Sequence, residues 1–179
     1  MNCWPVPKSH SRYLPCDGES GSFWEQRQDR FHCGVDIYAP QKSDIISIAD
    51  GTVVDLGIFT SPSQVRYWNT TYYLVIANNG GTFFRYAELD DVAVEKGTAI
   101  QAGDFLGSVG QVLHIKKIDD TCPLYIRQLK EKKHTSMLHI EWHDRPLFPS
   151  KTYLGGNWFG TRKPEGLLDP TSLLESISD

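Results

Sequence analysis

Short β-type segments, each ended by glycine or another turn residue, follow one another closely between residues 45 and 143. The segments 72–77 and 82–87 are rich in aromatic and β-branched residues, and the sequence Asn-Asn-Gly-Gly at 78–81 is typical of a hairpin turn. So many short strands at close spacing predict a mostly β chain, folded as a compact antiparallel sheet or sandwich. The other predicted strands are 45–49, 52–56, 92–97, 99–104, 105–110 and 138–143.

Other parts of the chain lack this pattern. Residues 123–133 have apolar side chains at helical spacing and a basic end, which predicts a short helix inside an insertion at 111–135. The composition of residues 1–30 predicts an irregular arm, and the Pro- and Gly-rich segment 144–179 is expected to run back over the surface. We expect residues 1–179 to form a single domain that includes these additions.

The composition excludes several classes of protein. Apolar residues make up 40% of the chain and charged residues 22%, a balance typical of globular and not of disordered chains. A net charge of −4 without a basic block argues against a nucleic-acid partner, and no apolar run approaches the roughly 20 residues of a membrane span. Residues 1–7 lack the features of a signal peptide, which leaves a cytoplasmic location, another export route or a trimmed chain open. The oligomeric state does not follow from the sequence.

Residues 137–143 form a strand whose two faces differ sharply. Alternation places His139, Glu141 and His143 on one face together with Met137, while the other face is apolar. Two imidazoles and a carboxylate are an unusual density of metal-binding groups for one strand face. The alternative is an exposed polar face that carries histidines by chance.

A second set of metal-binding groups lies near residue 34. In an extended chain His32 and Asp36 share a face, and Gly34 between them has no side chain to block the gap. Imidazole and carboxylate both bind zinc, and catalytic zinc usually has three protein ligands and an open position. His32, Asp36 and His139 would make such a set, although the spacing of the first two is common in proteins without a metal.

Several segments in the same order resemble the lysostaphin-type (LytM) zinc endopeptidases. Phe31–Pro40 resembles the opening of that family, Phe84–Leu89 its Y-A-H-L segment, and Met137–Glu141 its H-L-H-F-E strand. The similarity runs in register from about Trp4 to Leu174. The remaining matching segments are 48–54, 94–110 and 168–171.

The resemblance implies a small antiparallel β fold with a zinc-bearing groove that cuts peptide bonds, typically in the cross-links of bacterial peptidoglycan. It places the zinc ligands on His32, Asp36 and His139. It also implies an extracytoplasmic location, secreted or periplasmic.

Two positions depart from the family pattern. Glu88 stands where the family has the histidine of Y-A-H-L, and Met137 stands where it has the first histidine of H-L-H. Methionine can neither take a proton nor donate a useful hydrogen bond. Glu88 has three interpretations: a general base, which we favour, a fourth zinc ligand that closes the site, or a surface carboxylate.

Three further residues are candidates for a supporting role. Glu141 shares a face with His139 and is expected to orient a neighbouring group by a hydrogen bond. His114 and His134, in the predicted insertion, are candidate replacements for the missing imidazoles, with plain solvent exposure as the alternative.

These observations predict a zinc-dependent metalloendopeptidase that acts on peptidoglycan-type or short peptides, with Glu88 as its base. The alternative is a catalytically inert adaptor of the same fold that binds zinc or peptidoglycan, and the loss of both usual histidines favours it. The insertion at 111–135 is expected to border the groove and limit which substrates enter.

Overall fold

The computed structural model describes residues 2–177. Within this range, every strand pairing is antiparallel, and the chain is mostly β with two α-helices. The predicted fold class is therefore confirmed. Residue 1 and residues 178–179, at the ends of the predicted arm and of the C-terminal segment, lie outside the described residues. The single-domain organisation stays a prediction.

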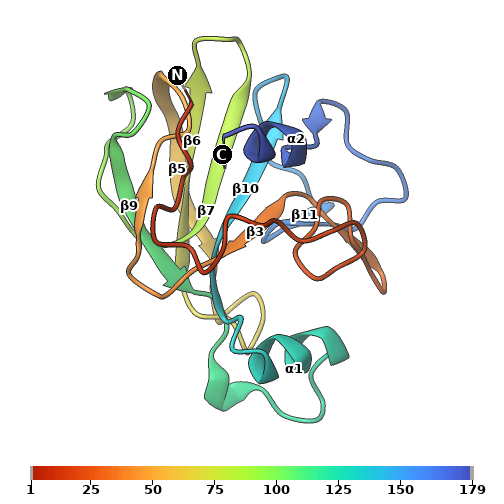
Figure 1. Cartoon of the computed structure of the whole chain (residues 1–179). Coiled ribbons are helices and arrows are strands. Elements are labelled where there is room, and N and C mark those ends of the chain that lie inside the picture. The colour runs from red at the N-terminus through yellow and green to blue at the C-terminus, as the bar shows by residue number, and fades with distance from the viewer. Residues whose placement is uncertain (1, 178–179) are drawn as a thin grey trace.

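A large curled sheet forms most of the molecule (Figure 1). β3 (Val35–Tyr38) pairs with β10, and β4 (Asp44–Ile46) pairs with β9. In the described part of the chain this sheet has nine strands. The other seven follow one another in space as β13 (Leu167–Leu168), β10 (Ser136–His143), β9 (Phe105–Gln111), β7 (Phe83–Val92), β6 (Thr71–Asn78), β5 (Gly51–Thr60) and β8 (Ala99–Ile100).

A second, smaller sheet joins the N-terminal arm to the C-terminal segment. Its order in space is β1 (Gln26–Arg27), β2 (Arg30–His32), β12 (Asn157–Trp158) and β11 (Tyr153–Leu154). The arm is thus irregular only up to residue 25 within the described range, and its end is a hairpin. This pairing brings two distant parts of the sequence to the edge of the large sheet where β2 leads into β3.

Most strand predictions hold, but β8 covers only Ala99–Ile100 of the predicted strand 99–104, and β4 ends at Ile46 within the predicted 45–49. β6 and β7 form the predicted hairpin, whose turn is stabilised by the Asn78 side chain accepting hydrogen bonds from the backbone of Gly80 and Thr82. The predicted strand at 92–97 is wrong, because β7 ends at Val92. Ala93 donates to Leu106 and Gly97 donates to Val53, so this segment crosses between two strands and pairs along neither.

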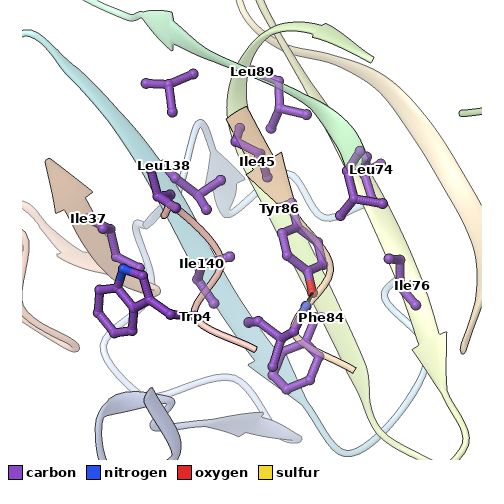
Figure 2. Packing of buried hydrophobic residues seen from close by; sticks show 14 of the residues in the cluster. Trp4, Ile37, Ile45, Leu74, Ile76, Phe84, Tyr86, Leu89, Leu138 and Ile140 are labelled. Carbon is purple, nitrogen blue, oxygen red and sulfur yellow. Dashed lines mark hydrogen bonds between the residues drawn. The ribbon is translucent and has the colours of Figure 1, made fainter. Parts of the chain in front are cut away.

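The core lies inside the curl of the large sheet. Tyr86 on β7 is completely buried there, among aliphatic side chains of β4, β6 and β10 (Figure 2). Leu138 and Ile140 point into this core, as the alternation along their strand predicts. The opposite face of β10 is therefore free to carry polar groups.

The segment between β9 and β10 forms a second cluster, at one end of the sheet (Figure 1). It contains a short 3₁₀ turn, η1 (Ile115–Lys117), and α1 (Leu124–Glu131), which confirms the predicted helix. The second helix, α2 (Thr171–Glu175), packs Leu174 into the main core. None of the helices in residues 2–177 is long and apolar enough to cross a membrane. What we call the insertion cluster consists of Trp68, Val112, Leu113, Ile118, Cys122, Ile126 and Leu129.

The buried hydroxyl of Tyr86 gives a test of the core. The backbone N–H of Ile48 donates to it at 2.8 Å, so Tyr86→Phe leaves a buried N–H unpaired and should lower the free energy of unfolding by about 1–3 kcal/mol. The matched control is Tyr73→Phe, because its hydroxyl donates to Asp55 at an exposed position. That change should stay within about 0.5 kcal/mol. Urea unfolding of both variants measures the difference, and equal losses would contradict this account of the core.

Candidate metal centre

Three adjacent strands bring His32, Asp36 and His139 together. His32 ends β2, Asp36 lies in β3 and His139 lies in β10. The register of β3 and β10 pairs His139 directly with Asp36. All three side chains are buried, with 2%, 5% and 2% of the residue surface exposed in that order. They form a group that could hold a metal ion.

The possible ligand atoms converge on one point. Nδ1 of His139 lies 2.9 Å from Oδ1 of Asp36 and 3.0 Å from Nε2 of His32. Nε2 of His32 lies 3.2 Å from the same Asp36 oxygen. In a tetrahedral zinc site with ordinary bond lengths, ligand atoms are separated by about 3.3 Å. Two imidazole nitrogens and one carboxylate oxygen at these separations fit zinc after a small outward shift.

The far nitrogen of each imidazole has a hydrogen-bond acceptor. His32 donates from Nδ1 to the carbonyl of Ser22 at 2.8 Å, and His139 donates from Nε2 to Oε1 of Glu141 at 3.1 Å. These bonds fix both rings so that the other nitrogen faces the centre, as in many metal sites. The structure thus places Glu141 behind His139, where it orients the ring.

Two glycines allow His139 to sit where it does. A Cβ at Gly34 would lie 2.2 Å from the Ile140 carbonyl oxygen and 2.8 Å from the His139 ring. A Cβ at Gly156, which has a φ of +75°, would lie 2.9 Å from the same ring on its other side. Gly34 therefore leaves the gap that the sequence predicted, and Gly156 is a contact that sequence reasoning missed.

Glu141 is the centre of a buried ionic network. It accepts hydrogen bonds from Arg85 and His143, both at 3.0 Å, and from the Tyr153 hydroxyl. The Arg85 guanidinium lies over the rings of Tyr73 and Tyr153. Burial alone would raise the pKa of Glu141, but the charge of Arg85 and these hydrogen bonds hold it well below its usual range.

Glu88 reaches the centre from a bulge in β7. β6 pairs Tyr73 with Ala87 and Tyr72 with Leu89, so Glu88 is an extra residue between two paired ones. Its φ is 67°, a left-handed conformation that is rare outside glycine. On the other side Gly110 lets the bulge approach, since a Cβ there would lie 2.6 Å from the Glu88 carbonyl oxygen. Bulges commonly re-aim a side chain next to an active site.

The carboxyl group of Glu88 is buried without full pairing. Only 8% of the residue is exposed, which excludes the interpretation as a surface carboxylate. Its Oε2 atom has no hydrogen-bond partner among the described residues. Burial, together with the negative charge of Asp36, raises the pKa of Glu88 to about 8. An unpaired carboxyl oxygen that lines the same cavity as the three ligands fits a site that could hold a cation.

The charges of the three ligands are strongly coupled. Burial alone would raise the pKa of Asp36, but the two imidazoles hold it well below its usual range. Burial alone would lower the pKa of His139, but the hydrogen bonds to Asp36 and Glu141 raise it to about 10. Burial lowers the pKa of His32. A metal ion at this centre would compete with the proton on Nδ1 of His139.

A small cavity of about 40 Å³ faces these groups. The insertion covers it with Tyr125, Ile126 and Leu129 of α1, as the sequence predicted for a segment bordering the groove. The structure does not bring His114 or His134 to it. The cavity is lined by Arg27, His32, Asp36, Trp68, Glu88, Val112, Leu113, Tyr125, Ile126, Leu129, Met137, His139, Gly155 and Asn157.

The two insertion histidines have other surroundings. His134 stacks on Tyr38 and lines a separate groove beside the N-terminal arm, and His114 precedes η1. The loop between β9 and β10 carries both away from the centre and puts apolar residues of α1 there instead. Neither histidine takes the place of the missing imidazoles.

The sequence model of Peptidase family M23 matches residues 30–143, more than half of the chain. The chain belongs to this family. The resemblance to the lysostaphin type is thereby confirmed. No curated protein matches the chain.

Solved structures share the fold at low sequence identity. The catalytic domain of the antimicrobial peptidase lysostaphin from Staphylococcus simulans is 16% identical, with a TM-score of 0.51, over 98% of this chain and 90% of that one. A putative glycyl-glycine endopeptidase lytM from Ruminococcus gnavus is 20% identical, with a TM-score of 0.55, over 99% of this chain and 60% of that one. At these identities the structural likeness shows that this chain has the same fold, and nothing about its activity.

The pKa of Glu88 predicts a specific pH dependence for the metal-free protein. Because the pKa rises from 4.5 to about 8 on folding, the folded chain keeps a proton that the unfolded chain releases between these values. Wild-type stability should therefore fall across this window relative to Glu88→Gln, by at most about 1.4 kcal/mol per pH unit. Urea unfolding in chelator at pH 5, 6, 7 and 8 measures the difference. A difference that does not change with pH would show that Glu88 is not buried as a neutral acid.

Proposed function

We propose that this chain is a zinc-dependent peptide hydrolase that cuts peptidoglycan-type peptides outside the cytoplasm. Membership of a peptidase family supports a peptidase-type function in general. The observation that carries the proposal is the convergence of His32, Asp36 and His139 with the unpaired oxygen of Glu88 on one cavity.

The three ligands would hold the zinc through Nε2 of His32, Oδ1 of Asp36 and Nδ1 of His139. Zinc bound there supplies Lewis acidity, which polarises a peptide carbonyl and makes water a stronger acid. The hydrogen bonds from His32 to Ser22 and from His139 to Glu141 keep each ring in the tautomer that binding needs.

Glu88 is the proposed general base. It would take a proton from the attacking water on its free oxygen and pass that proton to the leaving amine as the C–N bond breaks. A cation on the three ligands would lower the pKa of Glu88 and free its carboxylate to accept the proton. The competing role is a fourth zinc ligand, which would leave no position for water.

The small size of the cavity favours the alternative function. Its volume of about 40 Å³ is far below the roughly 300–1,000 Å³ of ordinary ligand pockets. Met137, at the position of a usual family histidine, lines the same space. An inert adaptor that binds zinc or peptidoglycan would keep the fold and the three ligands without needing access.

Zinc binding should depend on His32. The purified wild-type chain should bind one zinc ion, and His32→Ala should bind it at least 10-fold more weakly. His114→Ala is the matched control, because the described residues that line the cavity do not include it. Affinity should fall steadily as the pH is lowered, because the metal must displace the proton that Asp36 and Glu141 hold on the His139 ring. Metal analysis and competition with a chelator measure this, and equal zinc content in both variants would refute the ligand set.

Glu88→Gln separates the roles of Glu88. As the base, its loss should leave zinc content near one per chain and lower the hydrolysis of peptidoglycan peptides by about 10²-fold or more. Glu95→Gln, an exposed carboxylate on the surface, should change neither quantity. If Glu88 is a fourth ligand, the same change should instead weaken zinc binding. A zinc-loaded wild type that cleaves none of these peptides would support the adaptor.

A further inference from the structure

Arg27 brings a buried cation to the proposed metal centre. It lies at the end of β1, in the N-terminal arm, and only 10% of its side chain is exposed. Among the described residues that line the cavity, it is the one lysine or arginine. The arm has no sequence pattern that would single out this arginine, and the pairing of β1 with β2 brings it to the site.

The guanidinium of Arg27 is firmly held. Its Nε donates to Oε2 of Glu25 at 3.0 Å, and its Nη1 donates to the side-chain oxygen of Asn157 at 3.2 Å. Its Nη2 forms an ion pair with the same Glu25 oxygen at 2.9 Å. The group is therefore fixed from both the N-terminal arm and the C-terminal segment, which is the preorganisation that a binding group needs.

Not all of its N–H donors have a hydrogen-bond partner among residues 2–177. A guanidinium has five N–H groups, and the three contacts above account for three of them. The nearest carboxylate oxygen on the metal side, Oδ2 of Asp36, is 3.7 Å from Nη2, beyond ordinary hydrogen-bond length. Donors are thus left on the terminal nitrogens, beside the carboxylate whose other oxygen faces the centre.

The site lacks the donors that its family usually places here. Glu88 and Met137 occupy the two histidine positions, and neither an ionised carboxylate nor a thioether donates a hydrogen bond. Much of the cavity lining is apolar, including Trp68 and Leu113. In such surroundings a fixed cation stabilises negative charge more strongly than it would in water.

We propose that Arg27 is the oxyanion-binding residue of this site, donating its free N–H groups to the carbonyl oxygen of the scissile peptide bond. This rests on the proposed function. Water adds to the carbonyl carbon, its proton moves to Glu88, and the carbonyl oxygen becomes negative. When the C–N bond breaks, that proton leaves with the amine. Arg27 stays protonated throughout and only donates hydrogen bonds.

The competing role is to position Asp36. A guanidinium that holds a ligand carboxylate should strengthen metal binding, so its removal should weaken zinc affinity. A guanidinium that serves an oxyanion instead repels the cation slightly, so its removal should leave zinc affinity unchanged or improve it. The two roles therefore predict opposite changes in a quantity that does not depend on catalysis.

The experiment compares zinc-loaded wild type with Arg27→Met, Arg27→Lys and the control Arg30→Met. Arg30 lies on β2 of the same small sheet and pairs with Asp29, away from the cavity. The probe is a phosphinic analogue of a glycine dipeptide, whose tetrahedral anionic group resembles the negatively charged state. Calorimetry gives its affinity, chelator competition gives the zinc affinity, and peptide cleavage gives kcat and KM.

We expect Arg27→Met to weaken phosphinate binding and lower kcat by about 10- to 100-fold, with zinc affinity unchanged or higher. Arg27→Lys keeps the charge but loses the planar set of N–H donors, so its phosphinate affinity and kcat should lie between those of wild type and Arg27→Met. Arg30→Met should have the same values as wild type. If circular dichroism shows that Arg27→Met does not fold, Arg27→Lys tests the proposal. It should bind the phosphinate at least several-fold more weakly than wild type.

Three results would overturn the proposal. Both Arg27 variants could keep the phosphinate affinity of wild type, or Arg27→Met could lose zinc affinity together with phosphinate affinity. The third is that wild type does not bind the phosphinate. Wild type that binds phosphinate through Arg27 but cleaves no peptide would support the oxyanion site while the proposed hydrolysis fails. If wild type cleaves peptides and Arg27→Met cleaves them with the same kcat, the role of Arg27 is overturned and the proposed function stays intact.

Discussion

The antiparallel pairing of β3 with β10 holds His139 directly opposite Asp36. Because side chains alternate along a strand, a shift of one residue in this register would turn His139 into the core and Leu138 toward the metal centre. The register is fixed by the apolar face, where Leu138 and Ile140 fill the core. The hydrophobic effect thus fixes the polar site indirectly: the chain cannot bury one face of β10 without presenting the other to Asp36.

The buried charges around the site depend on one another. Glu141 is completely buried and carries a charge that Arg85 and its hydrogen-bond donors compensate. Arg27 and Glu25 form a similar pair on the other side of the ligands. Removing one member of such a pair leaves an uncompensated buried charge, which commonly costs about 3–5 kcal/mol. The polar groups therefore form one unit with the metal ligands. A change in the charge or position of any of them affects a ligand directly or through one intermediate residue.

The mostly β fold and the three candidate ligands could be predicted, because alternation, turn composition and family motifs are all local properties of the sequence. The position of Glu88 could not be predicted. A bulged residue with a positive φ is usually a glycine, and here the glycine that permits the bulge is Gly110, on the neighbouring strand. Arg27 was missed for a similar reason. The β1–β2 hairpin carries it, but its guanidinium is held by Asn157, which is 130 positions away in the sequence, and no local pattern encodes that contact. The insertion histidines failed as candidates because α1 presents its apolar face to the centre.

The cover over the centre is also a thermodynamic barrier. Ile126 and Leu129 are almost completely buried within the insertion cluster, and exposing both side chains to water would cost about 3–6 kcal/mol. An open form would then be populated at a level on the order of 10⁻² to 10⁻⁴. Any ligand that needs the open form binds more weakly by the same factor. A peptide with an apolar side chain could recover part of this loss by packing on Trp68 in place of the helix. The site would then select peptides with apolar residues next to the scissile bond.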